Sequence, residues 1–198
     1  FVIVPDLRLP GLKGIVGSEI VSVEIPLYIP KATSIYARCQ ASTASMTCQV
    51  MVHLFSQGFM GLPGFSRVDC LGAIATSRGV AVDPGGTANT KVRTQIVAST
   101  ANRYGGMFGM IGPNTDVSRT ALASALMDIS VGGAGVEYNI LSNFQMTWST
   151  TYDIPWPWVI PTFPCDIPKA SRVSVNAQCS DNTASDRTLD VCLYGLIP

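Results

Sequence analysis

The pattern of apolar and polar positions along this chain is mostly that of β-strands. Apolar side chains recur at every second position in short runs, which is typical of strands with one buried face. Turns rich in glycine and proline separate these runs. Such a pattern predicts an all-β, antiparallel fold, either one jelly-roll-like β-sandwich or two small sandwiches. The expected strands include residues 20–25, 67–76, 80–82, 92–99, 106–111 and 136–146.

Residues 119–131 fit two patterns. Leu122, Leu126 and Ile129 have the spacing of a helix face. The end of the segment, however, runs directly into a glycine-rich turn, as a strand of a β-protein does. We therefore favour a strand that begins at about Ala125.

A motif occurs twice in the chain. Residues 29–39 read IPKATSIYARC and residues 167–179 read IPKASRVSVNAQC, and in both copies TAS and a second apolar run follow. An internal repeat marks a repeated structural unit. We interpret each copy as a β-hairpin that closes such a unit. The residues expected to face the core in the second copy are Val173, Val175, Ala177, Cys179, Leu189, Val191 and Leu193.

The match between the two copies extends toward the N-terminus, so that residues 1–56 echo residues 138–198. The chain is therefore interpreted as a partial β unit, residues 1–56, followed by a complete β-sandwich unit, residues 57–198. A partial unit leaves strand edges unpaired and an apolar face uncovered. We expect it to form a second sheet packed against the complete unit, or to complete a neighbouring subunit by strand addition.

The second copy differs from the first by an insertion of nine residues. It lies within the stretch IPWPWVIPTFPCDIP, residues 154–168, which we interpret as a proline-stiffened loop. Aromatic side chains on such a loop can cap the core, form a subunit interface or stack on sugar rings. The aromatic residues concerned are Trp148, Tyr152, Trp156, Trp158 and Phe163.

The chain has six cysteines, and none of them forms a CxxC pair. Zinc-finger and redox motifs are therefore unsupported. Cys39 and Cys48 fall on the apolar face of adjacent expected strands, which allows a disulfide between them. Cys179 and Cys192 fall on opposite faces, which disfavours a bond between those two. The alternative for all six is a buried free thiol.

Composition argues against several classes of protein. The chain has 198 residues, of which 13% are charged, and its net charge is zero. A nucleic-acid-binding protein needs a basic surplus, and no apolar run is long enough to cross a bilayer. A neutral surface with few charges suits a subunit that buries its surface against copies of itself. The start at Phe1, without Met, indicates processing or an incomplete chain, and no signal peptide is visible.

No motif of catalysis stands out. The only histidine, His53, lies on the polar face of an expected strand, and there is no GxSxG. The acidic residues form neither a distinctive pair nor a DxDxDG calcium loop, and the glycine loop at residues 83–90 does not match a phosphate-binding loop. We therefore expect no enzyme activity, no cofactor and no metal.

Three motifs, of which the repeated motif is the third, resemble in their order those of a family of proteins. They are Asn89-Thr-Lys91 followed by QIVAST at residues 95–100, then DISVGGAGVE at residues 128–137, then IPK…ARC. Together they resemble structural proteins of tailed bacteriophages, in which a pattern like NTKG-W-LTAST, DI-VG-AG-E and IP-G-R-AR recurs in each β-rich unit. The resemblance covers residues 73–198 in order, and the second half of the pattern occurs again at residues 1–56. This chain departs from the pattern at Val92 and Ala170, where the pattern has glycine.

The resemblance implies a structural virion protein of a phage-like particle: a capsid decoration, fibre or tail component. Such a protein acts by self-assembly, here expected as a trimer or larger array, together with other virion proteins, and it is located in the virion or outside the cell. The resemblance implies no catalytic residue. The alternative interpretation is an extracellular β-sandwich module that binds glycans, such as those of a host surface, through a loop that contains Trp156 and Trp158.

Overall fold

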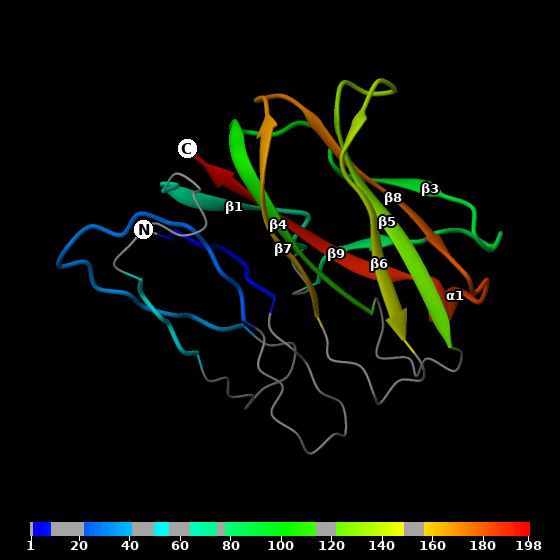
Figure 1. The fold of residues 1–198 in the computed structure, drawn as a ribbon, viewed down its shortest axis with the longest axis horizontal. Coiled ribbons are helices and arrows are strands. Elements are labelled where there is room, and N and C mark those ends of the chain that lie inside the picture. Colours follow the sequence, from blue (N-terminus) through cyan, green and yellow to red (C-terminus); the bar gives the residue numbers. More distant parts are fainter. Residues whose placement is uncertain are drawn as a thin grey trace, which may run out of the picture.

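The computed structural model of the chain describes residues 2–8, 22–40, 50–55, 64–74, 78–113, 122–148 and 157–198. Within these ranges it contains nine strands and one short helix (Figure 1). The elements are β1 (Arg67–Leu71), β2 (Val80–Val82), β3 (Val92–Val97), β4 (Tyr104–Pro113), β5 (Ala123–Gly132), β6 (Tyr138–Trp148), β7 (Trp158–Ile167), β8 (Arg172–Cys179), α1 (Ala184–Arg187) and β9 (Leu189–Ile197).

The strands form two antiparallel sheets that pack face to face. The first sheet has the order β1-β9-β4-β7, with β2 also paired to β9, and the second has the order β3-β8-β5-β6. β1 and β2 pair with successive parts of β9, so that they act as one interrupted strand. From β2 onward each strand lies in the sheet opposite its predecessor, except β6, which follows β5 in the same sheet. This is the arrangement of a jelly roll, and the predicted all-β, jelly-roll-like sandwich is confirmed.

The core lies between the two sheets and is built from alternate residues of their strands. In β8 and β9 the seven residues predicted to face inward are all buried in this core. Burial of apolar surface at about 25 cal/mol per Å² makes such inward positions the main source of sandwich stability. The ambiguous segment is also resolved, because residues 123–132 form strand β5, as favoured, and not a helix.

The predicted hairpin of the second copy is wrong. β8 lies between β3 and β5 in one sheet, whereas β9 lies between β1 and β4 in the other, and the short helix α1 comes between them in sequence. Both strands are central, and each turns one face to the same core. Alternation of apolar residues shows which face of a strand is buried, but it does not show whether the next strand lies beside it or across the core.

The first copy of the motif forms no strand where the structure describes it. Residues 34–40 and 50–55 belong to neither sheet, and residues 22–25 also form no strand. The strands predicted in these ranges are therefore wrong for the residues that the structure describes. None of the described strands pairs with these ranges, and a strand needs the hydrogen-bond ladder of a neighbour. Residues 41–49, with the predicted turn, lie outside the described residues. The division into units 1–56 and 57–198 stays a prediction.

Two N-terminal segments, residues 2–8 and 22–27, cover the outer face of the first sheet (Figure 1). Tyr194 of β9 donates a hydrogen bond to the carbonyl oxygen of Asp6 at 2.9 Å and accepts one from the N–H of Arg8 at 3.1 Å. The contact buries a second, smaller apolar cluster on the side of the sheet away from the core. Its members include Val4, Leu7, Val23, Ile25, Leu27, Phe65, Val68, Phe108, Met110, Cys192 and Tyr194.

The tryptophan-rich stretch predicted as a loop is a strand where the structure describes it. Residues 158–167 form β7, which among the described strands pairs with β4 alone and is thus an edge strand. Pro161 and Pro164 lie within it. Proline cannot donate to a ladder and is tolerated in a sheet at such an edge. The prolines therefore blunt an edge strand rather than stiffen a loop.

Candidate functional site

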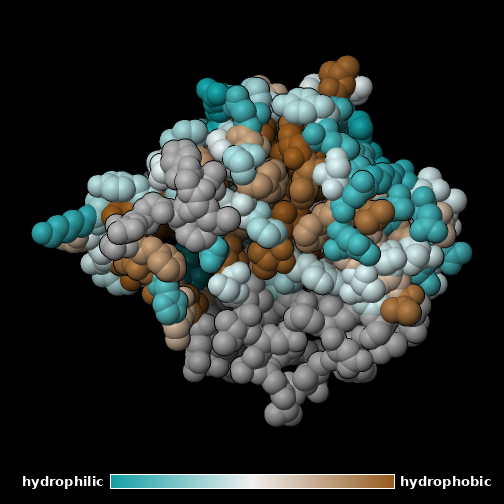
Figure 2. Space-filling view, in the orientation of Figure 1, coloured by the Kyte–Doolittle hydropathy of each residue, from teal (hydrophilic) through white to brown (hydrophobic). Residues whose placement is uncertain are grey.

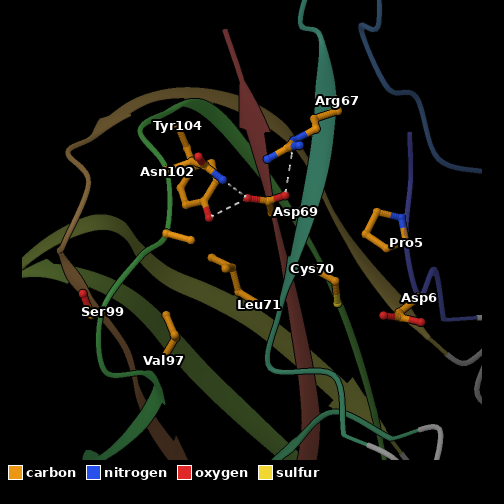
Figure 3. Close-up of a pocket in the computed structure, with 11 residues that line it drawn as sticks. Pro5, Asp6, Arg67, Asp69, Cys70, Leu71, Val97, Ser99, Asn102 and Tyr104 are labelled. Atoms are coloured by element: carbon orange, nitrogen blue, oxygen red, sulfur yellow. Dashed lines mark hydrogen bonds and ion pairs between the residues drawn. The ribbon is translucent and has the colours of Figure 1, made fainter. Parts of the chain in front are cut away.

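A cavity of about 480 Å³ lies between β1, the β3–β4 loop and the N-terminal segment (Figure 3). Its wall consists of β1, the start of β4, the loop between β3 and β4, and the N-terminal segment at residues 5–6. Its ionisable groups include Asp6, Arg67 and Asp69, which come from parts of the chain far apart in sequence. Acidic, basic and aromatic groups from distant parts of the chain thus share the wall of this cavity.

Asp69 is the centre of hydrogen bonding in the cavity. It accepts a hydrogen bond from Asn102 Nδ2 at 2.7 Å and another from Tyr104 Oη at 3.1 Å, while Arg67 Nε lies 3.7 Å away. Burial, together with the charge of Asp69, raises the pKa of Tyr104, so the phenol stays protonated and donates. Gly195 gives the buried Tyr104 ring its room, because a Cβ there would lie 2.6 Å from ring atoms. The network fixes the carboxylate in one orientation.

The residues that line the cavity include a thiol but no base that would activate it as a nucleophile. No histidine is among its lining residues. The thiol of Cys70 contacts Cys192, and this contact together with burial raises the pKa of Cys70. A thiol with a raised pKa is a poor nucleophile at neutral pH. The arrangement offers hydrogen-bonding groups around Asp69 and no activated nucleophile.

A second polar cluster lies on the outer face of the β3-β8-β5-β6 sheet. Lys91 Nζ donates to Asp128 Oδ2 at 2.6 Å, and the N–H of Asn143 donates to Asp128 Oδ1 at 2.8 Å. Burial acts to raise the pKa of Asp128, but these two donors outweigh burial, and the pKa is lowered. Nearby, Glu137 lies between Arg93 at 2.8 Å and Arg172 at 3.2 Å. The cluster binds the four strands to one another and leaves its carboxylates paired.

The motifs that carry the phage resemblance meet in space as structural contacts. Lys91 of the NTK motif pairs with Asp128 of the DI motif. Thr100, at the end of QIVAST, donates a hydrogen bond from Oγ1 to the carbonyl of Pro168 in the second IPKA and accepts one from the N–H of Ser171 at 3.0 Å. These pairs connect β3 to β5 and β8. The quoted motifs thus act as a scaffold, and the sequence analysis missed that role because the partners lie 37 and more residues apart.

The aromatic residues singled out from the sequence do not form a surface site where they are described. Trp148 is buried, and its ring packs at 44° against that of Trp158, with centroids 5.6 Å apart. Trp158 and Phe163, both in β7, are half-buried and pack against the core. Tyr152 and Trp156 lie outside the described residues. The structure therefore brings Trp148 and Trp158 together at the core, as a cap requires, and their role as a partner or glycan contact stays a prediction.

The cysteine predictions have separate outcomes. Cys39 takes part in a disulfide, but Cys48 lies outside the described residues, so a bond between these two stays a prediction. Cys179 and Cys192 are not joined by a disulfide and lie in different sheets, as disfavouring a bond between them implies. Among the described residues, no group of three histidine, cysteine or acidic side chains is placed to hold a metal ion. Within that same part of the chain, no helix has the length and apolar character of a membrane span.

Comparisons with known proteins add little. No family model matches the chain, and no curated protein matches it. Among solved structures, it is similar to a chain of the T13 IBDV viral particle, with 12% identity, a TM-score of 0.39 and coverage of 75% of this chain and 35% of that chain. It is also similar to a chain of infectious bursal disease virus, Gx strain, with 12% identity, a TM-score of 0.34 and coverage of 75% and 38%. The chain thus spans little more than a third of either neighbour, and similarity at this level carries no argument about function.

Proposed function

We propose that this chain is a structural subunit of a virus particle and acts by self-assembly with copies of itself. The observation that carries the proposal is the apolar surface of the first repeat copy, which stands exposed on a chain with only 13% charged residues (Figure 2). Exposed apolar side chains that gather in one region of a surface mark interaction sites. The exposed residues are Tyr28, Ile35, Tyr36, Val50, Met51, Val52, Leu54 and Phe55.

The fold is compatible with this function but does not by itself imply it. Jelly rolls occur in viral capsid proteins, in lectins and in cupins, and one fold serves many functions. The choice between these functions depends on the polar clusters and cavities that the fold carries. The two polar clusters described above, at Asp69 and at Asp128, tie strands to one another, and no histidine or activated thiol lines the cavity at Asp69. A non-enzymatic, structural role is therefore the proposal that these sites support best.

The finer assignment rests on the motif resemblance. On that resemblance we propose that the subunit belongs to a phage-like particle as a capsid decoration, fibre or tail component, in contact with other virion proteins and as a trimer or larger array. The contacts between the motifs support the resemblance as one pattern, because Lys91 pairs with Asp128 and Thr100 bonds to Pro168.

Sedimentation velocity over a range of protein concentrations, with electron microscopy of the same samples, tests the proposal. We expect reversible assemblies whose mass rises with concentration and which repeat on images as rings or lattices. A chain that stays monomeric at the highest concentration would contradict self-assembly.

A glycan array distinguishes the alternative function. Sugar binding by the chain that is lost in Trp156→Ala and in Trp158→Ala, in variants that keep the melting temperature of the parent chain, would favour the glycan-binding module over the structural subunit. Trp148→Ala is not a useful probe of glycan binding, because Trp148 is buried and its loss would disturb the fold.

A further inference from the structure

Lys91, Asp128 and Asn143 meet on the outer face of the β3-β8-β5-β6 sheet. Lys91 Nζ donates to Asp128 Oδ2 at 2.6 Å and to Asn143 Oδ1 at 3.0 Å. The N–H of Asn143 also donates to Asp128 Oδ1 at 2.8 Å, so the three residues contact one another in a closed set. An amine, a carboxamide and a carboxylate held together in this way are the groups that formation of a new amide needs.

A β-bulge in β6 brings Asn143 to this position. The register of β6 against β5 shifts by one residue beside Asp128, so that Ser142 and Asn143 both lie opposite it. Asn143 has a φ of 55°, in the left-handed region. Bulges re-aim a side chain and are frequent beside active sites. The bulge therefore sets the carboxamide of Asn143 beside the amine and the carboxylate.

The distances are close to those of a reacting pair. Asn143 Cγ lies at most about 4.2 Å from Lys91 Nζ, because a carbonyl bond of about 1.23 Å separates Cγ from Oδ1. A near-attack geometry needs about 3–3.5 Å between the reacting atoms. Asn143 is exposed, so rotation about its side-chain bonds can supply the remaining approach.

Asp128 is placed to carry the protons that such a reaction moves. Its side chain is 4% exposed, whereas that of Lys91 is 34% exposed. Burial acts to raise the pKa of Asp128, although its donors outweigh burial and the pKa is lowered. The uncharged pair, in which Asp128 holds a proton taken from Lys91, is therefore a minor state. Reaction from a minor state is slow, but the product accumulates because the departing ammonia is lost to solvent.

We propose that Lys91 and Asn143 join in an intramolecular isopeptide bond, with Asp128 as the general base and acid. Asp128 takes a proton from the Lys91 ammonium, and the neutral Nζ attacks Cγ of Asn143. The Nζ–Cγ bond forms and the Cγ–Nδ2 bond breaks. One of the three Nζ protons stays on the new amide, and the other two go with Nδ2, which leaves as ammonium. The ion pair described above is the state before the bond forms.

The bond connects the two ends of the sheet. Lys91 directly precedes β3, and Asn143 lies in β6, the strands at either end of the order β3-β8-β5-β6 (Figure 1). A cross-link between residues 52 positions apart reduces the conformational freedom of the unfolded chain. The bond therefore stabilises the sandwich within one chain, and the inference does not depend on the proposed self-assembly.

Intact-mass spectrometry of the folded full chain, followed during prolonged incubation, tests the inference. We expect a product that is lighter than the sequence by one ammonia, and a branched tryptic species that contains both Lys91 and Asn143. Lys91→Arg keeps the positive charge but cannot form the bond, and Asp128→Asn removes the proton carrier, so neither variant should give this product. Lys169→Arg is the matched control, because Lys169 is an exposed lysine outside the cluster, and it should react like the parent chain.

Thermal unfolding followed by circular dichroism gives a second readout and shows that each variant is folded. The melting temperature of the parent chain should rise as the product accumulates, while that of Lys91→Arg should stay constant. A folded parent chain that keeps its full sequence mass would overturn the inference. Loss of ammonia that persists in Lys91→Arg would overturn it as well, because an asparagine can also lose ammonia by attack of its own backbone.

Discussion

The two copies of the IPKA motif form the same turn, but the chain that follows the turn differs between them. In both copies the alanine of IPKA is left-handed, with φ of 64° at Ala32 and at Ala170. In the first copy Thr33 closes this turn by donating to the carbonyl of Pro30 at 2.7 Å. The chain that follows is exposed after Ala32 and central to both sheets after Ala170. Identical short sequences thus form identical turns but not identical strands.

The difference lies in what surrounds each turn. The turn at Ala170 is held by Thr100, which exchanges backbone hydrogen bonds with Ala170 at 2.9 Å and Ser171 at 2.8 Å. The strand that follows the turn, β8, pairs with β3 on one side and with β5 on the other. The first copy has no such flanking strands within the described residues. A turn needs only local sequence, whereas a strand is stable only when neighbours satisfy its backbone and cover its apolar face.

A pair of leucine substitutions should show the largest difference in stability between the two copies. Leu193→Ala in the second copy leaves a cavity in the core and should lower the free energy of unfolding by about 2–5 kcal/mol. Leu54→Ala in the first copy removes an exposed side chain and should change it by less than about 0.5 kcal/mol. Urea denaturation of dilute, monomeric protein measures both. Equal losses would mean that the first copy is packed as tightly as the second.

A glycine substitution tests how closely the second copy is packed. Gly195→Ala in β9 places a Cβ 2.6 Å from the buried ring of Tyr104, and overpacking of this kind should cost about 1–3 kcal/mol. Gly86→Ala is the control, because a Cβ at Gly86 meets no atom within 4 Å. Thermal unfolding followed by circular dichroism is the measurement. A neutral Gly195→Ala would show that the Tyr104 ring moves freely.

The ion pair on the outer face makes the second copy's sheet sensitive to acid. The pKa of Asp128 is lowered in the folded chain, below the value of about 3.9 for an unfolded chain. Its stabilisation is therefore complete above about pH 4 and is lost as pH falls through the lower, folded pKa. Asp128→Asn should cost about 1–2 kcal/mol at pH 7, since the Lys91 ammonium is partly exposed.

Urea titrations at pH 7 and at pH 2.5 compare the parent chain with Asp128→Asn. The difference between them should shrink at the lower pH, where Asp128 of the parent is progressively protonated. A difference that does not depend on pH would assign the cost to packing and not to the charge of Asp128.

The smallest expected effect concerns the shared turn. Ala170 occupies a left-handed conformation that favours glycine, and glycine stands at this place in the phage pattern that the chain resembles. Ala170→Gly should raise stability by about 0.5–1 kcal/mol, because left-handed backbone is costly for alanine. Ala32→Gly should raise it less, since the exposed first copy contributes little to global unfolding. A loss of stability in Ala170→Gly would refute strain at this turn.

Alternation of apolar residues was enough to locate most strands of the sandwich and the inward faces of β8 and β9. The residues from Val173 to Leu193 that were expected to face the core do so, because a period of two depends only on the local pleat. Turn residues such as those of IPKA are equally local. The jelly-roll class followed from many such strands between turns.

Which strands pair and which distant side chains contact one another, in contrast, could be learned only from the folded chain. Nothing in the run from Arg172 to Ile197 shows that β8 and β9 lie in opposite sheets, and nothing in QIVAST shows that Thr100 holds the turn at Ala170. The polar network of Asp69, Asn102 and Tyr104 was missed for the same reason. Periodicity records the burial of one residue, but pairing depends on which distant segments compete for the same edge, and that competition is decided by the packing of the whole chain.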